Sequence, residues 1–313
     1  MLAATNQNLS AAMSELRARA VSPFRETSAY EALWAIEGMT ETKLAALFNS
    51  SGQAPRPSTV WAHYIASQAG LFGRDSFEKL LETVSTFLAA ELKTASVVLN
   101  GDAQYPTGLR DAKYPAEVLY YAGSLDLART RAISIVGARK ASTDGLKRAR
   151  TLSRQLVERD FTVVSGLATG IDTAALSSAI EAKGHVIGVV GTPINQVYPA
   201  ENAQLQHDIA QNHLVLSQVP MYRYAHEPFA NHKFYFPRRN VTMAALSCAT
   251  VIVEASDTSG SHTQARACLT QGKKLFILDS CFHNPSITWP AKYLAQGAVR
   301  VTSIADIDLA LAA

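Results

Sequence analysis

The chain has 313 residues, which is enough for one large hydrophobic core together with a small one. Its apolar fraction of 48% and charged fraction of 18% are ordinary for a globular protein. The formal net charge of +3 is too small to indicate nucleic-acid binding by itself, so local clusters of charge must carry any such claim.

Residues 1–27 are predicted to form an N-terminal extension. A short helix is expected around Leu9–Arg19 and is broken at Val21–Phe24, which contains a proline.

Residues 28–94 are predicted to form a small all-helical domain. Apolar side chains recur at helical spacing on both sides of Glu37–Met39, and two more helices are expected near Thr59–Gly70 and Ser76–Leu92. The turn at Glu37–Met39 has two interpretations. It resembles a helix-hairpin-helix, which places backbone N–H groups against DNA phosphate, and it also fits a corner between two packed helices.

Residues 95–313 are predicted to form an α/β domain. Two short strands, Ser96–Leu99 and Val118–Gly123, come first. From Ala132 onward, apolar strands alternate with helical patterns; these strands lie near 133–136, 161–164, 185–190, 213–217, 250–254 and 274–278. Strands that are apolar throughout are buried on both faces, so we predict an extended, Rossmann-like, doubly wound and mostly parallel sheet.

Small and basic residues follow several of these strands. They are Gly137, Arg139 and Lys140 after the first, Ser165 and Gly166 after the second, and Ser259, Gly260 and Ser261 after the fifth. The carboxyl ends of parallel strands share one edge of the sheet, where helix N-termini offer unpaired N–H groups. We therefore predict a phosphate site at this edge. Each residue alone also fits a structural role, as a solvated charge or a tight turn.

The connection from Gln218 to Phe236 is rich in aromatic, basic and histidine side chains. Connections of this length are usually functional or disordered. Rings that stack on bases, beside cations that hold phosphates, are typical of sites for single-stranded nucleic acid. Pro237 is expected to begin a helix with both following arginines in its first turn, where cations need an anion nearby. The candidate residues are Lys233, Phe236, Arg238, Arg239 and Asn240. The alternative is that the rings pack on the sheet edge.

No catalytic, metal or targeting signal is present. The P-loop, the nucleophile elbow and the GxGxxG fingerprint are absent, and His226 and His232 lack the further ligands of a metal site. Glu254 is expected to order a ribose hydroxyl or to pair with an arginine, and His262 to contact ligand or solvent. The three cysteines show no CxxC pairing, and neither an apolar run of about 18 residues nor a signal peptide occurs. We expect a cytoplasmic protein without cofactor, metal or membrane span, and no enzyme.

Several motifs in one order resemble the DNA-processing protein A (DprA, also called Smf) family. They are Ile135–Lys140, Val163–Asp172, Val197–Asn202, Phe236–Asn240, Val253–Ala255 and Ser259–Ser261. The resemblance extends from about residue 98 to 301. It implies a Rossmann-like domain after a small helical domain, binding of single-stranded DNA, a homodimer, and a RecA-type recombinase as partner in natural transformation.

The resemblance also implies roles for particular residues. Arg139 matches the arginine that holds a DNA phosphate, and Ser165 with Gly166 matches the floor of the pocket. Phe236–Asn240 matches the stretch that contacts bases and phosphates, and Ser259–Ser261 matches a second phosphate cradle.

The chain departs from the family pattern at several points. Leu176 replaces a usual histidine, Val241 replaces a further arginine, and the late Gly-Cys-Asn motif and winged-helix tail are missing. We expect a divergent member, and these departures bear on transformation more than on the fold. The alternative is a nucleotide-ligand sensor or nucleotide-processing enzyme of related fold, for example in bacterial defence. Thermal stabilisation by a mononucleotide alone would favour that alternative.

Overall fold

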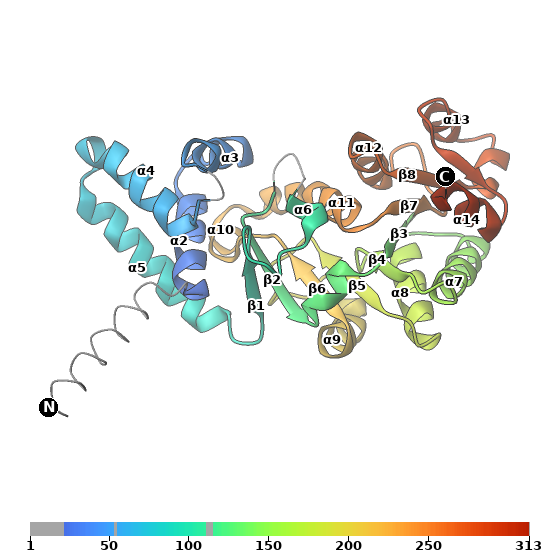
Figure 1. Cartoon of the computed structure of the whole chain (residues 1–313), viewed down its shortest axis with the longest axis horizontal. Helices are drawn as coiled ribbons and strands as arrows, with labels where there is room; N and C mark the ends of the chain where they lie inside the picture. The colour runs from blue at the N-terminus through green and yellow to red at the C-terminus, as the bar shows by residue number, and fades with distance from the viewer. Residues whose placement is uncertain (1–21, 53–54, 111–114, 313) are drawn as a thin grey trace, which may run out of the picture.

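The computed structural model describes residues 22–52, 55–110 and 115–312, so the helix expected around Leu9–Arg19 lies outside the described residues. A nine-stranded sheet with helices on both faces forms the larger part of the molecule, and four helices form a lobe at one end (Figure 1). No helix in these ranges is long and apolar enough to cross a bilayer.

Among the described residues, the N-terminal lobe contains four helices: α2 (Pro23–Ala35), α3 (Glu41–Ser50), α4 (Pro57–Phe72) and α5 (Arg74–Glu91). Helix α2 begins earlier than the helical pattern expected from Ser28. The hydroxyl of Ser22 accepts a hydrogen bond from the N–H of Arg25 (3.3 Å), and Pro23 occupies the first helical turn. A proline that breaks a helix interior is favourable at this position, because the first N–H groups of a helix have no intrahelical partner.

The sheet is parallel except at one end, which confirms the predicted fold class. The strands are β1 (Ser96–Leu99), β2 (Val118–Gly123), β3 (Ala132–Val136), β4 (Thr162–Ser165), β5 (Val186–Val190), β6 (Leu214–Ser217), β7 (Ala249–Ile252), β8 (Lys274–Leu278) and β9 (Val299–Val301). Their order is β1-β2-β6-β5-β4-β3-β7-β8-β9, with β2 antiparallel to both β1 and β6. Chain order therefore reverses between β3 and β7, a switch point where doubly wound sheets bind ligands.

The helices of this part are α6 (Thr107–Arg110), α7 (Thr143–Val157), α8 (Ile171–Glu181), α9 (Ala203–Asn212), α10 (Met221–His226), α11 (Tyr235–Leu246), α12 (Ser261–Thr270), α13 (Trp289–Leu294) and α14 (Ile304–Ala312). The connection from Gln218 to Phe236 is helical where a loop was expected, since it contains α10 and the 3₁₀ helix η3 (Phe229–Phe234). Pro220 and Pro228 are the N-cap residues of these two helices, a position where the missing N–H of proline costs no intrahelical hydrogen bond.

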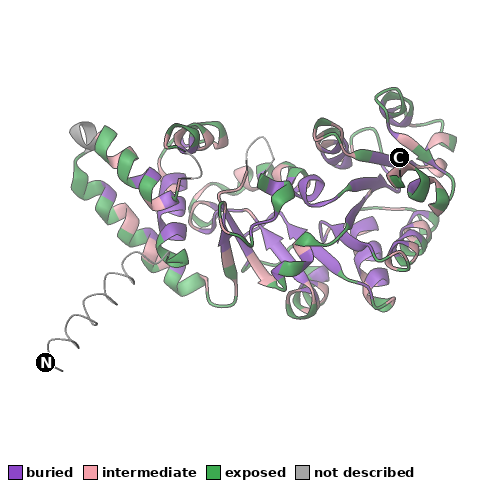
Figure 2. Ribbon diagram, in the orientation of Figure 1, coloured by how far each residue is buried: buried purple, intermediate pink, exposed green. Residues whose placement is uncertain are grey.

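Helix α2 packs on the sheet, and one buried apolar cluster runs from α2 into the strands. Figure 2 shows buried residues concentrated in the strands and on α2. Glu31 lies within this junction. Its carboxylate accepts hydrogen bonds from the hydroxyl of Tyr120 and from the N–H groups of Met221 (2.6 Å) and Tyr222 (3.1 Å). Burial raises the pKa of Glu31 to about 7.

The turn between α2 and α3 packs against the α/β part. A guanidinium nitrogen of Arg223, on α10, donates to the carbonyl of Met39 (2.7 Å). Met39 itself is buried. These contacts favour the interpretation of this turn as a packing corner over a helix-hairpin-helix.

Candidate functional site

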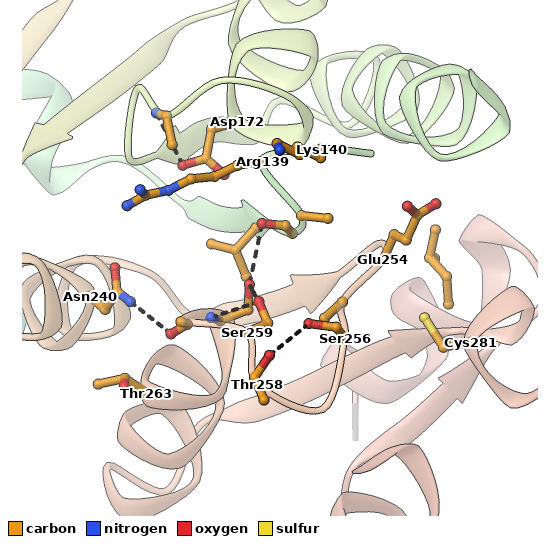
Figure 3. A pocket seen from close by; sticks show the side chains of 18 of the residues that line it. Arg139, Lys140, Asp172, Asn240, Glu254, Ser256, Thr258, Ser259, Thr263 and Cys281 are labelled. Carbon is orange, nitrogen blue, oxygen red and sulfur yellow. Dashed lines mark hydrogen bonds between the residues drawn. The ribbon is translucent and has the colours of Figure 1, made fainter. Parts of the chain in front are cut away.

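A groove of ≈ 2060 Å³ lies at the carboxyl ends of the strands, beside the switch point between β3 and β7. Helices α7 and α8 border it on one side, and α11 and α12 on the other (Figure 3). Of the thirteen site residues predicted from the sequence, the structure brings ten to this groove; they are Gly137, Arg139, Lys140, Lys233, Phe236, Arg239, Asn240, Ser259, Gly260 and Ser261. Ser165, Gly166 and Arg238 do not line it.

Exposed cations and rings form one rim of the groove. The guanidinium carbon of Arg139 lies 5.7 Å from the centroid of the Phe236 ring, and Arg139 has no ion-pair partner among the described residues. The ring of Tyr198 lies 5.6 Å from that of Phe236 and is half exposed. Lys233 lies beside the ring of Phe234, 5.3 Å from its centroid. An unpaired guanidinium next to exposed rings can hold a phosphate while a base stacks.

Tyr198 was not among the predicted site residues. It lies within the Val197–Asn202 motif, which the resemblance included without giving it a role. The motif could have indicated Tyr198 as a site residue, because a tyrosine beside a proline in a connection at the sheet edge is placed for binding.

Arg239 is buried beneath the groove and holds the surrounding turns. One of its terminal nitrogens lies 3.7 Å from a carboxylate oxygen of Asp172, which also accepts from the N–H of Gly166 (3.1 Å). Burial raises the pKa of Asp172, and the charge of Arg239 opposes that rise. A Cβ atom at Gly166 would lie 1.0 Å from the same arginine nitrogen. Glycine is therefore required at position 166 because the guanidinium of Arg239 occupies the space of a side chain.

Ser165 does not face the groove. Its side chain is fully buried, and its hydroxyl donates to the carbonyl of Ile135 (2.6 Å), which joins β4 to β3. In this arrangement the hydroxyl of Ser165 does not reach a phosphate in the groove, in contrast to the contact expected from the sequence.

Arg238 also turns away from the groove, although it is adjacent to Arg239. Its Nε atom lies 3.3 Å from a carboxylate oxygen of Glu41, and its guanidinium carbon lies 5.2 Å from the ring centroid of Trp34. Successive residues of a helix point about 100° apart, so the two arginines of α11 serve different sides of the molecule.

The turn before α12 is tied to the other walls of the groove. The amide of Asn240 donates to the carbonyl of Gly260 (3.1 Å), and the hydroxyl of Ser261 donates to the carbonyl of Gly137 (3.4 Å). Figure 3 shows these bonds beside Ser259. The start of α12 therefore lies in the groove next to the turn that carries Arg139.

Glu254 and His262 have structural partners. The carboxylate of Glu254 accepts from the N–H (2.9 Å) and the hydroxyl (2.5 Å) of Ser142, the residue that caps α7. His262 is buried, its ring Nε2 donates a hydrogen bond to the carbonyl of Ser256 (2.8 Å), and it stacks on Tyr293. Within the described ranges, no three histidine, cysteine or acidic side chains are grouped as metal ligands would be.

These features define a Rossmann-like protein with a cationic and aromatic groove at the switch point of its sheet. The family model for DNA recombination-mediator protein A matches residues 96–311, about two thirds of the chain. The chain belongs to this family, and the resemblance inferred from its motifs is confirmed.

Curated relatives agree with this assignment. The chain is 34% identical over 205 residues to DNA processing protein DprA of Bacillus subtilis, covering 65% of this chain and 67% of the relative. It is 34% identical over 215 residues to the protein of the same name from Streptococcus pneumoniae, covering 66% of this chain and 71% of the relative.

Two solved structures are similar along most of their length. DNA processing protein A from Streptococcus pneumoniae matches with a TM-score of 0.70 and 26% identity, covering 92% of this chain and 97% of that one. DNA processing protein A from Helicobacter pylori, described for its single-stranded DNA binding mode, matches with a TM-score of 0.60 and 27% identity, covering 69% and 95%. Because the first similarity covers 92% of this chain, it includes most of the N-terminal helices, which lie outside the residues that the family model matches.

Proposed function

We propose that this protein binds single-stranded DNA in the groove and takes part in DNA processing. The observation that carries the proposal is the exposed, unpaired guanidinium of Arg139 beside the rings of Phe236 and Tyr198. Phosphate pairs with such a guanidinium, and bases stack on such rings irrespective of sequence. The activity is binding, with no chemical step.

The size of the groove supports a polymer over a mononucleotide. Its volume of ≈ 2060 Å³ exceeds the roughly 300–1,000 Å³ that is usual for small-molecule sites. The related protein of Helicobacter pylori, with 27% identity, is described as binding single-stranded DNA. Family membership further supports a homodimer, cytoplasmic residence and a RecA-type recombinase as partner.

The test is binding of a fluorescent oligo-dT strand at several salt concentrations. We expect Arg139→Ala to weaken binding and to reduce the salt slope by about one phosphate contact. Phe236→Ala should cost about 1–3 kcal/mol of binding free energy through lost stacking. Arg150→Ala is the matched control, because Arg150 is exposed on α7 outside the groove. Unchanged affinity in both groove variants would refute the proposal, and stabilisation by a mononucleotide alone would favour a nucleotide sensor.

A further inference from the structure

The groove continues beyond the residues that the family motifs supply. Figure 3 shows Arg139, Asn240 and Ser259 around one end, with Glu254 and Cys281 at the other. We call the second end the distal lobe. The side chains that line it come from α7, from the residues after β8 and from the residues after β9; they are Arg148, Thr151, Gln155, Ser280, Cys281 and Thr302.

Helix α7 presents one face to the distal lobe. Arg148, Thr151 and Gln155 recur at a spacing of three and four residues, which places them on one side of a helix. Arg150 and Arg154 lie on the remaining surface of α7 and do not line the groove. The basic residues of α7 are thus divided between the groove and open solvent.

Arg148 is the cation of this lobe that lacks an anion. Its side chain is partly buried, and its Nε atom is fully buried with no hydrogen-bond partner. Among the described residues, none forms an ion pair with it. Burial and the charge of Glu254 raise the pKa of the Cys281 thiol to about 12, and the charge of Arg148 opposes that rise, so both charged groups lie near the end of β8. No described group of the protein satisfies this guanidinium, so an incoming anion that pairs with its terminal nitrogens would be favoured here.

The carboxylates of the lobe are already engaged by other groups. Glu254 accepts two hydrogen bonds from Ser142. Asp279 lies 2.5 Å from a guanidinium nitrogen of Arg300 and 2.9 Å from a ring nitrogen of His283. The positive charge of Arg300 reduces the repulsion that Asp279 would exert on an anion at Arg148, whereas Ser142 is neutral and holds the Glu254 carboxylate in place without offsetting its charge.

We propose that the distal lobe binds a further phosphate of the same DNA strand, with Arg148 as its cation. The inference rests on the proposed function and extends it, because it predicts a strand that runs from the Arg139 rim past Glu254 to α7. An internal phosphodiester and a terminal phosphate share this chemistry. The continuous groove favours the internal phosphodiester.

The test is a ladder of oligo-dT strands of increasing length, bound to wild type, Arg148→Ala, Arg148→Lys and the control Arg154→Ala. We expect short strands to bind wild type and Arg148→Ala equally. Above a threshold length, Arg148→Ala should bind about tenfold more weakly, with a salt slope lower by about one contact. Arg148→Lys should recover part of the loss, because it keeps the charge and loses the bidentate geometry.

Each other outcome has a defined meaning. A loss that is equal at all lengths, or absent at all lengths, would overturn the distal site while leaving the proposed function intact. If a 5′-phosphate strengthens the binding of short strands and Arg148→Ala abolishes that gain, the distal lobe binds a terminal phosphate. The proposed continuous path of the strand is then wrong. If wild type binds no strand of any length, the proposed function itself fails.

Discussion

In the groove, Arg139 faces solvent beside the partly exposed ring of Phe236 and the exposed ring of Tyr198, and has no ion-pair partner among the described residues. At the junction between α2 and the sheet, Arg238 pairs with Glu41 and lies over Trp34, and Glu31 accepts three hydrogen bonds. A charge with partners stabilises the structure, whereas a charge kept without a partner indicates a ligand. Four predictions follow this contrast, from the largest expected effect to the smallest.

Arg239 lies at the groove, but it has a partner in Asp172 and therefore stabilises the structure. Replacing it by methionine leaves Asp172 buried without its cation, so Arg239→Met should lower the free energy of unfolding by about 3–5 kcal/mol. Urea unfolding measures this loss. The double variant Arg239→Met/Asp172→Asn should recover part of it, because the buried charge is gone. A loss well below this range in the single variant would show that Asp172 does not depend on Arg239.

Glu31 should make stability depend on pH. Its pKa is raised by burial to about 7 in the folded chain and is about 4.3 when unfolded. Between these values the folded state binds more protons, so the free energy of unfolding falls as pH rises from about 4.3 to 7, by up to about 4 kcal/mol, and is level above. Glu31→Gln cannot titrate and should lose part of this decline in urea unfolding at several pH values.

Glu117 provides the internal comparison for that measurement. Burial raises the pKa of Glu117 to about 7 as well, so it should account for the decline that remains in Glu31→Gln. Identical pH profiles in wild type and Glu31→Gln would contradict the assignment to Glu31.

Arg139 and Arg238 should differ in their effect on DNA affinity. Arg139→Ala should weaken oligo-dT binding about tenfold, equivalent to about 1.4 kcal/mol. Arg238→Ala should leave that affinity unchanged and lower stability by about 1 kcal/mol, through its partly exposed ion pair and its contact with Trp34. Fluorescence anisotropy and thermal unfolding on the same samples decide the point. A weaker DNA affinity in Arg238→Ala would place that residue at the ligand after all.

Ser165→Ala should have the smallest effect. Its hydroxyl bonds the carbonyl of Ile135 within the sheet, so its removal should cost about 1 kcal/mol of stability. Oligo-dT affinity should stay at the wild-type value, measured beside Arg139→Ala. A selective loss of DNA binding in a stable Ser165→Ala protein would restore the role that its motif suggested.

The strands were predictable because they are buried on both faces. Val186–Val190 and Ala132–Val136 are apolar almost throughout, and such runs leave few alternatives to a parallel sheet. The connection from Gln218 to Phe236 was not predictable as helical, because α10 and η3 are short and their own residues carry little helical periodicity. Contacts with α2, such as those of Arg223 with Trp34, accompany that conformation.

The sequence by itself determined the succession of strands and turns along the chain, because strand periodicity is a local pattern. It also determined the edge of the sheet where Arg139, Phe236 and Ser259–Ser261 meet, because the carboxyl ends of parallel strands share one edge. Only the tertiary structure decided which neighbour of a motif reaches the groove. Arg238 and Arg239 are adjacent in the chain, yet one contacts Glu41 and the other fills the space beside Gly166. The physical reason is that a side chain's direction and partners depend on residues far away in the sequence, which no local pattern specifies.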